Sequence, residues 1–231
     1  MKKAILTLLA ILCLTDAFSQ KTEFAIGLNS GLFSYAGISA DKSTFMNHST
    51  IKTYTNSIYG AKNGLSYGLS ANLKRLAANN HLIFGIDLGY ELLRSKVSII
   101  GISSSGSMLN AEGSTHLNTS FINVHPNLGY RLNTKDVSLD LTGGFDFGFI
   151  TKAEEKGKAT DQNGKTYTTE MDRKNVKTDL RPRIQLGLSR NFIGAYVGYA
   201  CGLKSYTQGM VGGPVGANSR LIRFGLTYQI H

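Results

Sequence analysis

The sequence predicts an all-β chain of eight antiparallel strands that each pair with the next along the chain. Two observations support this prediction. Apolar and polar residues alternate with a period of two in eight separate runs, and the connections between these runs are alternately short and long. No stretch has a convincing helical period, and no internal stretch approaches the roughly 20 consecutive apolar residues that a membrane-spanning helix needs. The 231 residues are enough for one large domain.

The first four runs place apolar side chains at alternate positions, with Ser30 as an exception. Most of the intervening positions hold glycine, asparagine, serine or a charged residue. These runs are FAIGLNSGL (24–32), LSYGLSANLK (65–74), LIFGIDLGYEL (82–92) and INVHPNLGYRL (122–132). Alternation of this kind over about ten residues predicts a strand with one apolar and one polar face.

The last four runs repeat the pattern in the second half of the chain. They are VSLDLTGGFDFGF (137–149), DLRPRIQLGL (179–188), IGAYVGYACGLK (193–204) and IRFGLTYQI (222–230). Each run supplies about the 9–11 residues that a tilted strand needs to cross a bilayer, or slightly more.

The connections show which ends of the strands lie together. The short ones are 78–80, 133–136 and 190–192, and the long ones are 37–62, 95–116, 152–175 and 207–219. The short ones contain Asn or Asp, which favour turns, and the long ones are rich in Ser, Thr, Asn, Gly and Lys. Strict alternation puts every short turn at one end, as in transmembrane barrels with short periplasmic turns and long external loops. A soluble sandwich has no reason to segregate its loops in this way.

The N-terminus predicts export from the cytoplasm. Lys2 and Lys3 precede an apolar run at 4–14, and the small residues Ala17 and Ser19 follow. This order is typical of a secretory signal peptide, here residues 1–19, which leaves residues 20–231 as the mature domain. The alternatives are an N-terminal core helix and a lipoprotein anchored at Cys13, although Leu12 is large for a lipoprotein signal. Cleavage leaves one cysteine, Cys201, and therefore no intramolecular disulfide.

The net charge constrains the partners. Removal of residues 1–19 changes the net charge from +10 to +9. An exported chain rarely meets nucleic acid, so we expect outer-membrane lipid and lipopolysaccharide as the anionic counterparts, and no nucleic acid. The alternative is that the excess of Lys and Arg serves solubility.

The run DLRPRIQLGL raises the question of which face meets water. Arg181 and Arg183 share one parity, while Leu180, Ile184 and Leu186 share the other. Glycines fall repeatedly on the polar parity, where they suit the crowded interior of an eight-stranded barrel better than a solvent face. Charged residues are nearly absent from the apolar parity, as a cost of about 2–4 kcal/mol per Arg or Lys at the bilayer midplane requires.

The sequence therefore predicts an eight-stranded antiparallel up-and-down transmembrane β-barrel after an N-terminal signal peptide, with apolar side chains toward lipid. Inward charges of both signs predict a luminal ionic network, which we interpret as a packed plug rather than a substrate pathway. Its predicted members are Glu91, Arg131, Asp140, Asp146, Asp179, Arg181, Arg183 and Arg223. Pro126 and Pro182 each remove a ladder donor from the apolar parity, and we expect a bulge or a bend at each.

We predict no catalytic, cofactor-binding or metal-binding residues. The stretch GMVGGPVG (209–216) lacks the Lys-Ser/Thr ending of a phosphate loop and is expected to be an external loop. One mature cysteine and scattered histidines make no usual zinc site. His125 is the most tempting catalytic candidate, but it faces the lumen and Pro126 and Asn127 follow it where a nucleophilic serine would be needed.

These features together resemble a known family. The signal peptide, the eight runs, the inward glycines and the segment NVHPNLGYRL (123–132) resemble the outer-membrane β-barrel family of Bacteroidetes-type bacteria that is labelled PorT-like. The resemblance covers residues 20–231 and implies an outer-membrane location and insertion by the barrel assembly machinery. The chain departs from such barrels at its C-terminus, which is His231 instead of an aromatic residue.

The leading functional prediction is a structural or surface-interaction protein, not an enzyme, whose long external loops bind a protein partner. One alternative is an accessory subunit of a secretion or transport assembly. The others are a lipid-modifying outer-membrane enzyme and, more distantly, a soluble periplasmic ligand-binding barrel.

Overall fold

The computed structural model describes residues 21–230 except 78–79, 105, 174 and 209–215. The predicted signal peptide, most of the glycine-rich stretch 209–216 and His231 lie outside the described residues. None of the described residues belongs to a helix with the length and apolarity that crossing a membrane requires.

The chain is all-β over its described residues, as the sequence predicts. The strands are β1 (Lys21–Ala36), β2 (Ser43–His48), β3 (Thr53–Thr55), β4 (Lys62–Ala77), β5 (Leu82–Ser104), β6 (Ser107–Asn133), β7 (Ser138–Asp161), β8 (Thr166–Asp172), β9 (Thr178–Arg190), β10 (Ile193–Cys201) and β11 (Asn218–Ile230).

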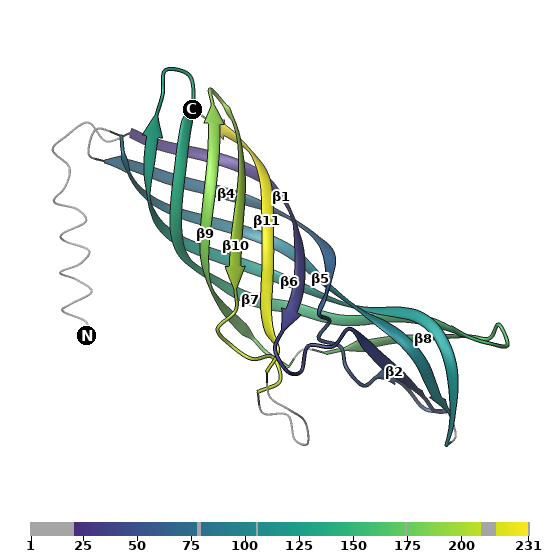
Figure 1. The fold of residues 1–231 in the computed structure, drawn as a ribbon. Helices are drawn as coiled ribbons and strands as arrows, with labels where there is room; N and C mark the ends of the chain where they lie inside the picture. Colours follow the sequence, from purple (N-terminus) through teal and green to yellow (C-terminus); the bar gives the residue numbers. More distant parts are fainter. Residues whose placement is uncertain (1–20, 78–79, 105, 174, 209–215, 231) are drawn as a thin grey trace.

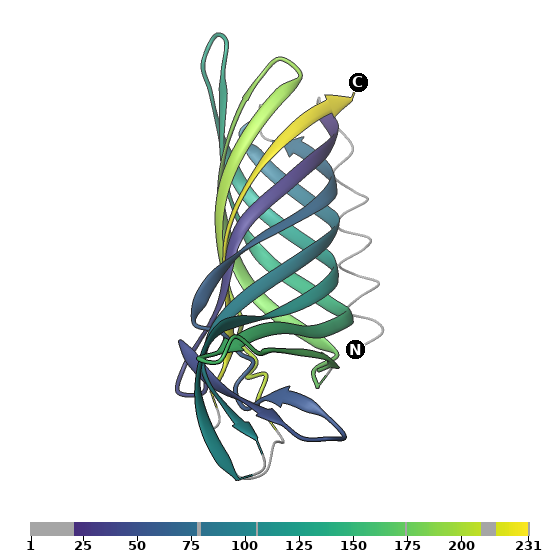
Figure 2. The same ribbon diagram turned by 90° about the vertical axis from the view of Figure 1, so that its right-hand side faces the viewer.

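Eight of these strands form a closed ring. The antiparallel pairs run in the order β1, β4, β5, β6, β7, β9, β10 and β11, and β11 pairs with β1. Figures 1 and 2 show these strands wrapping around a common axis at a steep tilt. Each of the eight predicted runs falls on one of these strands, although Val137 lies just before β7 and residues 202–204 lie beyond the end of β10. Closure matters because it leaves no unpaired strand edge, which a hydrocarbon environment would not tolerate.

The three predicted tight turns connect ring strands at one end of the ring. Asn80 and Asn191, at the β4–β5 and β9–β10 turns, have positive φ angles of 67° and 53°. Asparagine tolerates this left-handed conformation better than most residues, which explains its presence there. The C-terminal strand ends on the same side (Figure 1).

Three of the connections predicted as long loops contain regular strands instead. β5 continues to Ser104 and β6 begins at Ser107, β7 continues to Asp161 and pairs with β8, and β2 and β3 occupy part of 37–62. The sequence predicts only long external connections at 95–116 and 152–175 and does not predict these strands, in which Ser and Thr residues line a strand face. We call β2, β3, β8 and the continuations of β5 (93–104), β6 (107–120) and β7 (150–161) the extension.

The extension is a sheet with a core of its own. Its strands are ordered β3, β2, β5, β6, β7 and β8, and β2 pairs parallel to β5. Figure 1 shows it projecting beyond the ring on the side opposite the tight turns. One face buries an apolar cluster of Met46, Ile99, Ile102, Ala111, Ala159 and Tyr167.

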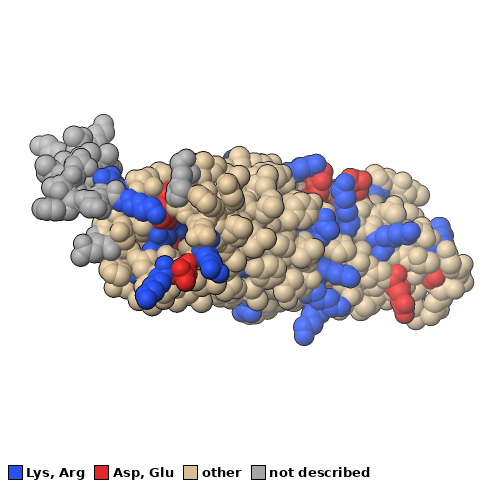
Figure 3. Space-filling model, turned by 90° about the horizontal axis from the view of Figure 1, so that it is seen from above, with Lys and Arg blue, Asp and Glu red and all other residues tan. Residues whose placement is uncertain are grey.

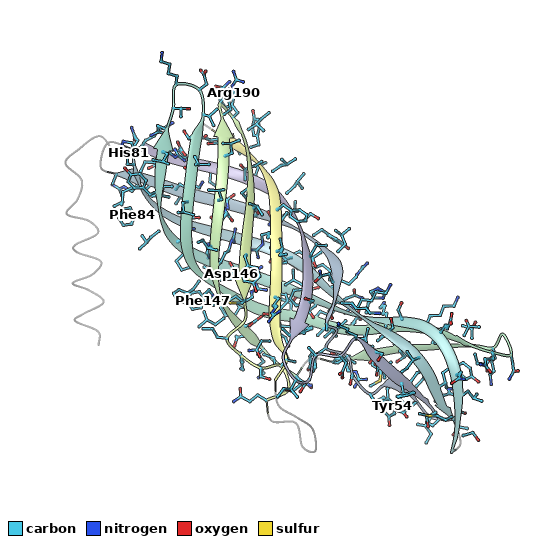
Figure 4. All side chains as sticks on the ribbon, viewed as in Figure 1. Tyr54, His81, Phe84, Asp146, Phe147 and Arg190 are labelled. Atoms are coloured by element: carbon cyan, nitrogen blue, oxygen red, sulfur yellow. The ribbon has the colours of Figure 1, made fainter. Side chains whose placement is uncertain are left out.

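The ring is apolar outside and polar inside, as predicted. Leu186 is 44% exposed on its outer surface, whereas Arg181, five residues earlier on β9, is 0% exposed. Figure 4 places Phe84 and Phe147 on the outside of the ring and Asp146 within it. Figure 3 shows most Lys, Arg, Asp and Glu side chains of the viewed face at its two ends, with a broad band of other residues between them. Apolar exposure on this scale marks a surface that contacts lipid or protein.

The two strand prolines sit where a ladder is interrupted or has ended. Pro126 is paired with Ile86 of β5, but the β6–β7 ladder passes from Val124–Phe147 to Asn127–Gly144 without it. Pro182 is paired with Phe145 of β7, while the pairing of β9 with β10 stops at Arg183. Each proline therefore has a regular ladder on one side and no ladder on the other, where its missing N–H does not break a hydrogen bond.

Candidate functional site: the luminal ionic network and its outer seal

Asp146 lies at the centre of a buried ionic cluster inside the ring (Figure 4). Its carboxylate is 3.1 Å from the guanidinium of Arg223, 3.3 Å from that of Arg183 and 3.7 Å from that of Arg181. His125 Nδ1 approaches the same carboxylate at 3.3 Å. These groups come from β6, β7, β9 and β11, so the cluster joins strands across the lumen as well as along the ring.

Glu91 of β5 completes this central cluster. Arg223 donates from Nε and Nη2 to the two Glu91 oxygens at 2.6 and 2.7 Å, which is the bidentate geometry that favours arginine over lysine. Asn123 Nδ2 donates to Glu91 Oε2 at 2.5 Å, and Arg181 Nη2 donates to Asn123 Oδ1 at 2.9 Å. The amide therefore links the acid to a second arginine.

Two more acids border the central cluster. Asp87 lies 3.7 Å from Arg183, and Asp179 lies 4.0 Å from Arg181. Tyr206 and Ser219 donate hydroxyl hydrogen bonds to Asp179 Oδ2 at 2.8 and 2.6 Å. Buried charges are costly unless they are paired and hydrogen-bonded. Here each charge has at least one partner of opposite sign, while some buried nitrogens of Arg181, Arg183 and Arg223 have no hydrogen-bond partner among the described residues.

A second cluster lies nearer the tight turns. The guanidinium of Arg131 is held between Glu23 of β1, at 2.9 Å, and Asp140 of β7, at 2.6 Å. Lys74 of β4 donates to Asp140 Oδ2 at 2.7 Å. These contacts tie β1, β4, β6 and β7 together at the opening of the ring.

All eight predicted network residues are buried, and the structure divides them between two clusters. Arg131 and Asp140 belong to the turn-side cluster, and the other six to the central one. Four further members were not predicted: Glu23, Lys74, Asp87 and His125. The inward parity of Lys74, Asp87 and His125 was visible in the sequence, while Glu23 immediately precedes the first predicted run.

Aromatic side chains close the lumen beyond the central cluster. Tyr35 of β1 makes edge-on contacts with Tyr59, at 5.1 Å between ring centroids, and with Tyr206, at 4.9 Å. Tyr59 Oη donates to the Tyr206 carbonyl oxygen at 3.1 Å. The three tyrosines pack with Phe33, Leu93, Leu117, Phe121, Leu221 and other apolar residues in one buried cluster. Because Tyr59 and Tyr206 come from the long connections, these connections fold over the end of the ring.

The cavities inside the ring are small. One of about 50 Å³ is lined by Asp87, Asp140 and Tyr196 among others, and one of about 40 Å³ by Glu23, Lys74 and Arg131 among others. Each has room for only one or a few water molecules. The opening at the tight turns is wider, about 470 Å³, and includes Lys135, Asp136 and Asn191.

A buried carboxylate holds the strands of the extension together. Glu155 of β7 is 0% exposed and accepts hydrogen bonds from Thr55 Oγ1 at 2.5 Å and Arg173 Nε at 2.7 Å. Thr169 Oγ1 of β8 donates to the Thr53 carbonyl of β3 at 2.8 Å. These contacts bring the two terminal strands of the extension together and make it a compact body.

The described residues contain no group of three or more His, Cys, Asp or Glu arranged to hold a metal ion. His125 is buried between Asp146 and the arginines, with Asp87 nearby.

Several solved structures align with the chain at low similarity. They include the attachment invasion locus protein Ail of Yersinia pestis, with 13% identity, 92% of this chain and 100% of that chain covered, and a TM-score of 0.35. Neisserial surface protein A has 9% identity and a TM-score of 0.37, with 91% of this chain and 99% of that chain covered. The Escherichia coli outer membrane protease OmpT has 14% identity and a TM-score of 0.38, with 94% of this chain and 100% of that chain covered. No curated protein matches the sequence. These similarities are too weak to carry an argument about function.

A protein-family model matches most of the sequence. The model of the "outer membrane protein beta-barrel domain" matches residues 18–208, which is most of the chain and contains most of the ring and all of the extension. This match implies that the protein resides in the outer membrane. The chain belongs to the outer membrane protein β-barrel domain family.

Proposed function

We propose that this protein is a closed outer-membrane barrel that anchors the extension at the cell surface, where the extension acts as a binding module. The ring would cross the membrane as eight antiparallel up-and-down strands, with the tight turns in the periplasm. The observation that carries the proposal is the sealed lumen: the Asp146 cluster and the Tyr35–Tyr59–Tyr206 contacts fill the ring on its extension side.

The sealed lumen favours binding over transport of solutes. Eight strands enclose a space that side chains fill, and here charged and aromatic groups occupy it. We expect no ion conductance above background when the purified barrel is reconstituted in planar bilayers. Steady single-channel openings in preparations whose folding has been verified would contradict the proposal.

The extension offers the binding surface. A cavity of about 410 Å³ lies among the connections that bear it and is lined by Asp41, Asn56, Tyr59 and Arg173 among others. Polar groups in a concave site of this size suit a ligand or a peptide segment. Cross-linking and co-purification from native membranes, with full-length protein and with a variant lacking 95–116, should show a protein partner that depends on the extension.

Partner capture would also separate the two roles that remain open. A cell-surface or extracellular partner supports the binding module, whereas stable recovery of other envelope transport proteins would favour an accessory subunit. The barrel assembly machinery is expected only during biogenesis, so it should be recovered from newly synthesised chains and not at steady state.

We further propose that the protein is not an enzyme. His125 is the strongest catalytic candidate, but its imidazole is buried in the ionic cluster and does not reach the outer surface of the barrel. Mass analysis of lipid A from cells with and without the protein should show identical species. A modified acyl chain or headgroup that disappears with the gene would overturn this part of the proposal.

Two finer assignments complete the proposal. We propose that residues 1–19 are removed as a signal peptide, so N-terminal sequencing of the protein from membranes should begin at Gln20. We also propose kinship with PorT-like barrels, supported by the NVHPNLGYRL segment, which forms the turn-side half of β6. An alignment with PorT-like chains that failed to match this segment and its flanking strands would contradict the kinship.

A further inference from the structure

A cluster of basic side chains lies on the outward face of the strands where the ring passes into the extension. It consists of Lys62 of β4, Arg94 and Lys96 of β5, and His116 of β6, which we call the basic patch. Lys62 is directly opposite Lys96 in the β4–β5 ladder, and Lys96 is directly opposite His116 in the β5–β6 ladder. Arg94 is two residues from Lys96 and points to the same face.

Lys62 and Lys96 are like charges directly opposite each other, an arrangement that destabilises the ladder unless an anion offsets it. Two cations of the basic patch donate to neutral side chains: Lys62 Nζ donates to Ser98 Oγ at 2.5 Å, and Arg94 Nε donates to Asn118 Oδ1 at 2.8 Å. Among the described residues, no acid lies within ion-pair distance of any of the four.

The neighbouring strand shows that this lack of acids is local. Lys156 of β7 is directly opposite His116, and its Nζ is 2.8 Å from Glu170 of β8. Lys152 of the same strand pairs with Glu154 at 2.6 Å. The protein therefore neutralises Lys152 and Lys156 with its own carboxylates, whereas Lys62, Arg94 and Lys96 have no carboxylate partner among the described residues.

His116 responds to this uncompensated charge. Partial burial, together with the positive charges of Lys96 and Arg94, lowers the pKa of its imidazole below the usual value. An external anion bound at the basic patch would reverse the contribution of the two cations and raise the pKa. The pKa of the His116 imidazole therefore indicates whether an anion is bound at the basic patch.

The patch lies next to the outward apolar surface of the same strands. Tyr67 of β4 and Tyr90 of β5 are 54% and 52% exposed, and Leu65 and Ile122 are also exposed. Lys62 is three residues beyond Leu65, and Arg94 is four residues beyond Tyr90, which corresponds to roughly 10–13 Å along a strand. Exposed tyrosines followed by flexible basic side chains are typical of the boundary between hydrocarbon and headgroups.

We propose that Lys62, Arg94, Lys96 and His116 bind phosphate groups on the headgroup of the outer-leaflet glycolipid, lipopolysaccharide. The inference rests on the membrane orientation given under the proposed function, because that orientation puts the patch in the outer leaflet. Phosphates carry the charge that the patch lacks, and a membrane lipid presents them at the height of the patch without a soluble ligand having to reach it.

The test measures binding to the full mature chain in maltoside micelles, which contain no phosphate. The probes are bisphosphorylated lipid A, enzymatically dephosphorylated lipid A and inorganic phosphate. We expect bisphosphorylated lipid A to bind more tightly than the dephosphorylated form. The double variant Lys62→Gln/Lys96→Gln should reduce its affinity roughly 30-fold, since two interfacial cations are lost. The variant Lys62→Arg/Lys96→Arg should restore most of it.

A matched control removes two exposed cations at the opposite end of the ring. Lys135→Gln/Arg190→Gln alters the tight turns and should leave lipid A affinity unchanged. In NMR titrations the pKa of His116 should rise when bisphosphorylated lipid A is added and stay constant with the dephosphorylated form.

Three outcomes would overturn the proposal: equal binding of the two lipid A forms, equal losses in the patch and control variants, or inorganic phosphate displacing lipid A at similar concentrations. The last would indicate a free-anion site. Heat-modifiable gel migration, measured for every variant, distinguishes failure of this proposal from failure of the proposed function. A wild-type chain that does not migrate as a folded barrel contradicts the membrane assignment, whereas a folded barrel without phosphate discrimination contradicts only the basic patch.

Discussion

The ring and the extension use the same strands with opposite chemistry. On β5, Leu88 and Tyr90 point outward and Asp87 and Glu91 point inward, so the ring is apolar outside. A few residues further, the outward positions become polar at Arg94 and Lys96, and the inward ones become apolar at Leu93 and Val97. The alternation continues without a slip while its two faces exchange character.

β6 makes the same exchange, since outward Ile122 gives way to Asn118 and His116 without a slip. On β7 the register shifts by one residue at Thr151, and outward Phe149 gives way to Lys152 beyond the shift. On β5 and β6 each side chain keeps the direction that the strand gives it, so the exchange there reports a change of solvent and not of fold. The hydrocarbon layer therefore ends between about residues 92 and 94 on β5, between 118 and 122 on β6, and between 149 and 152 on β7.

The largest effect is expected from removal of a central luminal charge. Arg181→Ala leaves Asp146 and Asp179 buried with fewer partners, so the free energy of unfolding should fall by about 3–5 kcal/mol. Urea unfolding in detergent micelles measures this loss. Arg190→Ala, an exposed residue of the same strand, should change stability by less than about 0.5 kcal/mol. Equal stability of the two variants would mean that the network contributes nothing to the ring.

The second effect tests the outer face of the ring. Leu186→Arg puts a cation on the lipid-facing surface at a cost of about 2–4 kcal/mol, so the heat-modifiable folded fraction in membranes should drop sharply. The same introduction of arginine at Ser114, an outward position of β6 in the extension, should be tolerated. If Leu186→Arg assembles as well as Ser114→Arg, the ring faces are assigned backwards.

A smaller effect is expected inside the extension. Glu155→Gln removes the carboxylate that holds Arg173 and Thr55, at a cost of about 1–3 kcal/mol confined to the extension. Hydrogen exchange should accelerate in β3 and β8 and stay unchanged in β9 and β10. Exchange that accelerates throughout the ring would show that the two regions unfold as one unit. The exposed Glu170→Gln is the control.

The smallest effect is expected at a proline. Pro126→Ala places an N–H where the β6–β7 ladder is already interrupted, so stability should change by less than about 1 kcal/mol. Melting temperatures in micelles compare it with Leu128→Pro, which removes a donor from a continuous part of the strand and should destabilise the ring strongly. A large loss in Pro126→Ala would require another role for the proline.

Much of the ring could be predicted because a single physical rule governs each position. In the stretch 179–188, every odd residue is charged, polar or glycine, and every even one is apolar or proline, so parity alone separates Arg181 from Leu186. The place of the prolines could not be predicted in this way, since it depends on where β10 ends and where the β6–β7 ladder is interrupted.

The extension was missed because the rule reverses there. The stretch 93–99 still alternates, with Leu93, Val97 and Ile99 on one parity and Arg94, Lys96 and Ser98 on the other. Its apolar residues are at odd positions, whereas those of 82–92 are mostly at even positions. A search for one continuous alternation, with the same face toward lipid throughout, therefore stops at residue 92. The grouping of the eight network residues into two clusters was also out of reach, because it depends on heights across the lumen.

The assignment of the ring to lipid and of the extension to water depends most on the exchange of faces along β5. Site-directed spin labels at Ile86, Leu88, Lys96 and Ser98, in a Cys201→Ser background reconstituted in outer-membrane lipid, measure it directly. We predict that labels at 86 and 88 collide preferentially with dissolved oxygen, and that labels at 96 and 98 collide with a water-soluble nickel complex. The same preference at all four positions would contradict the assignment of the ring to lipid and the extension to water.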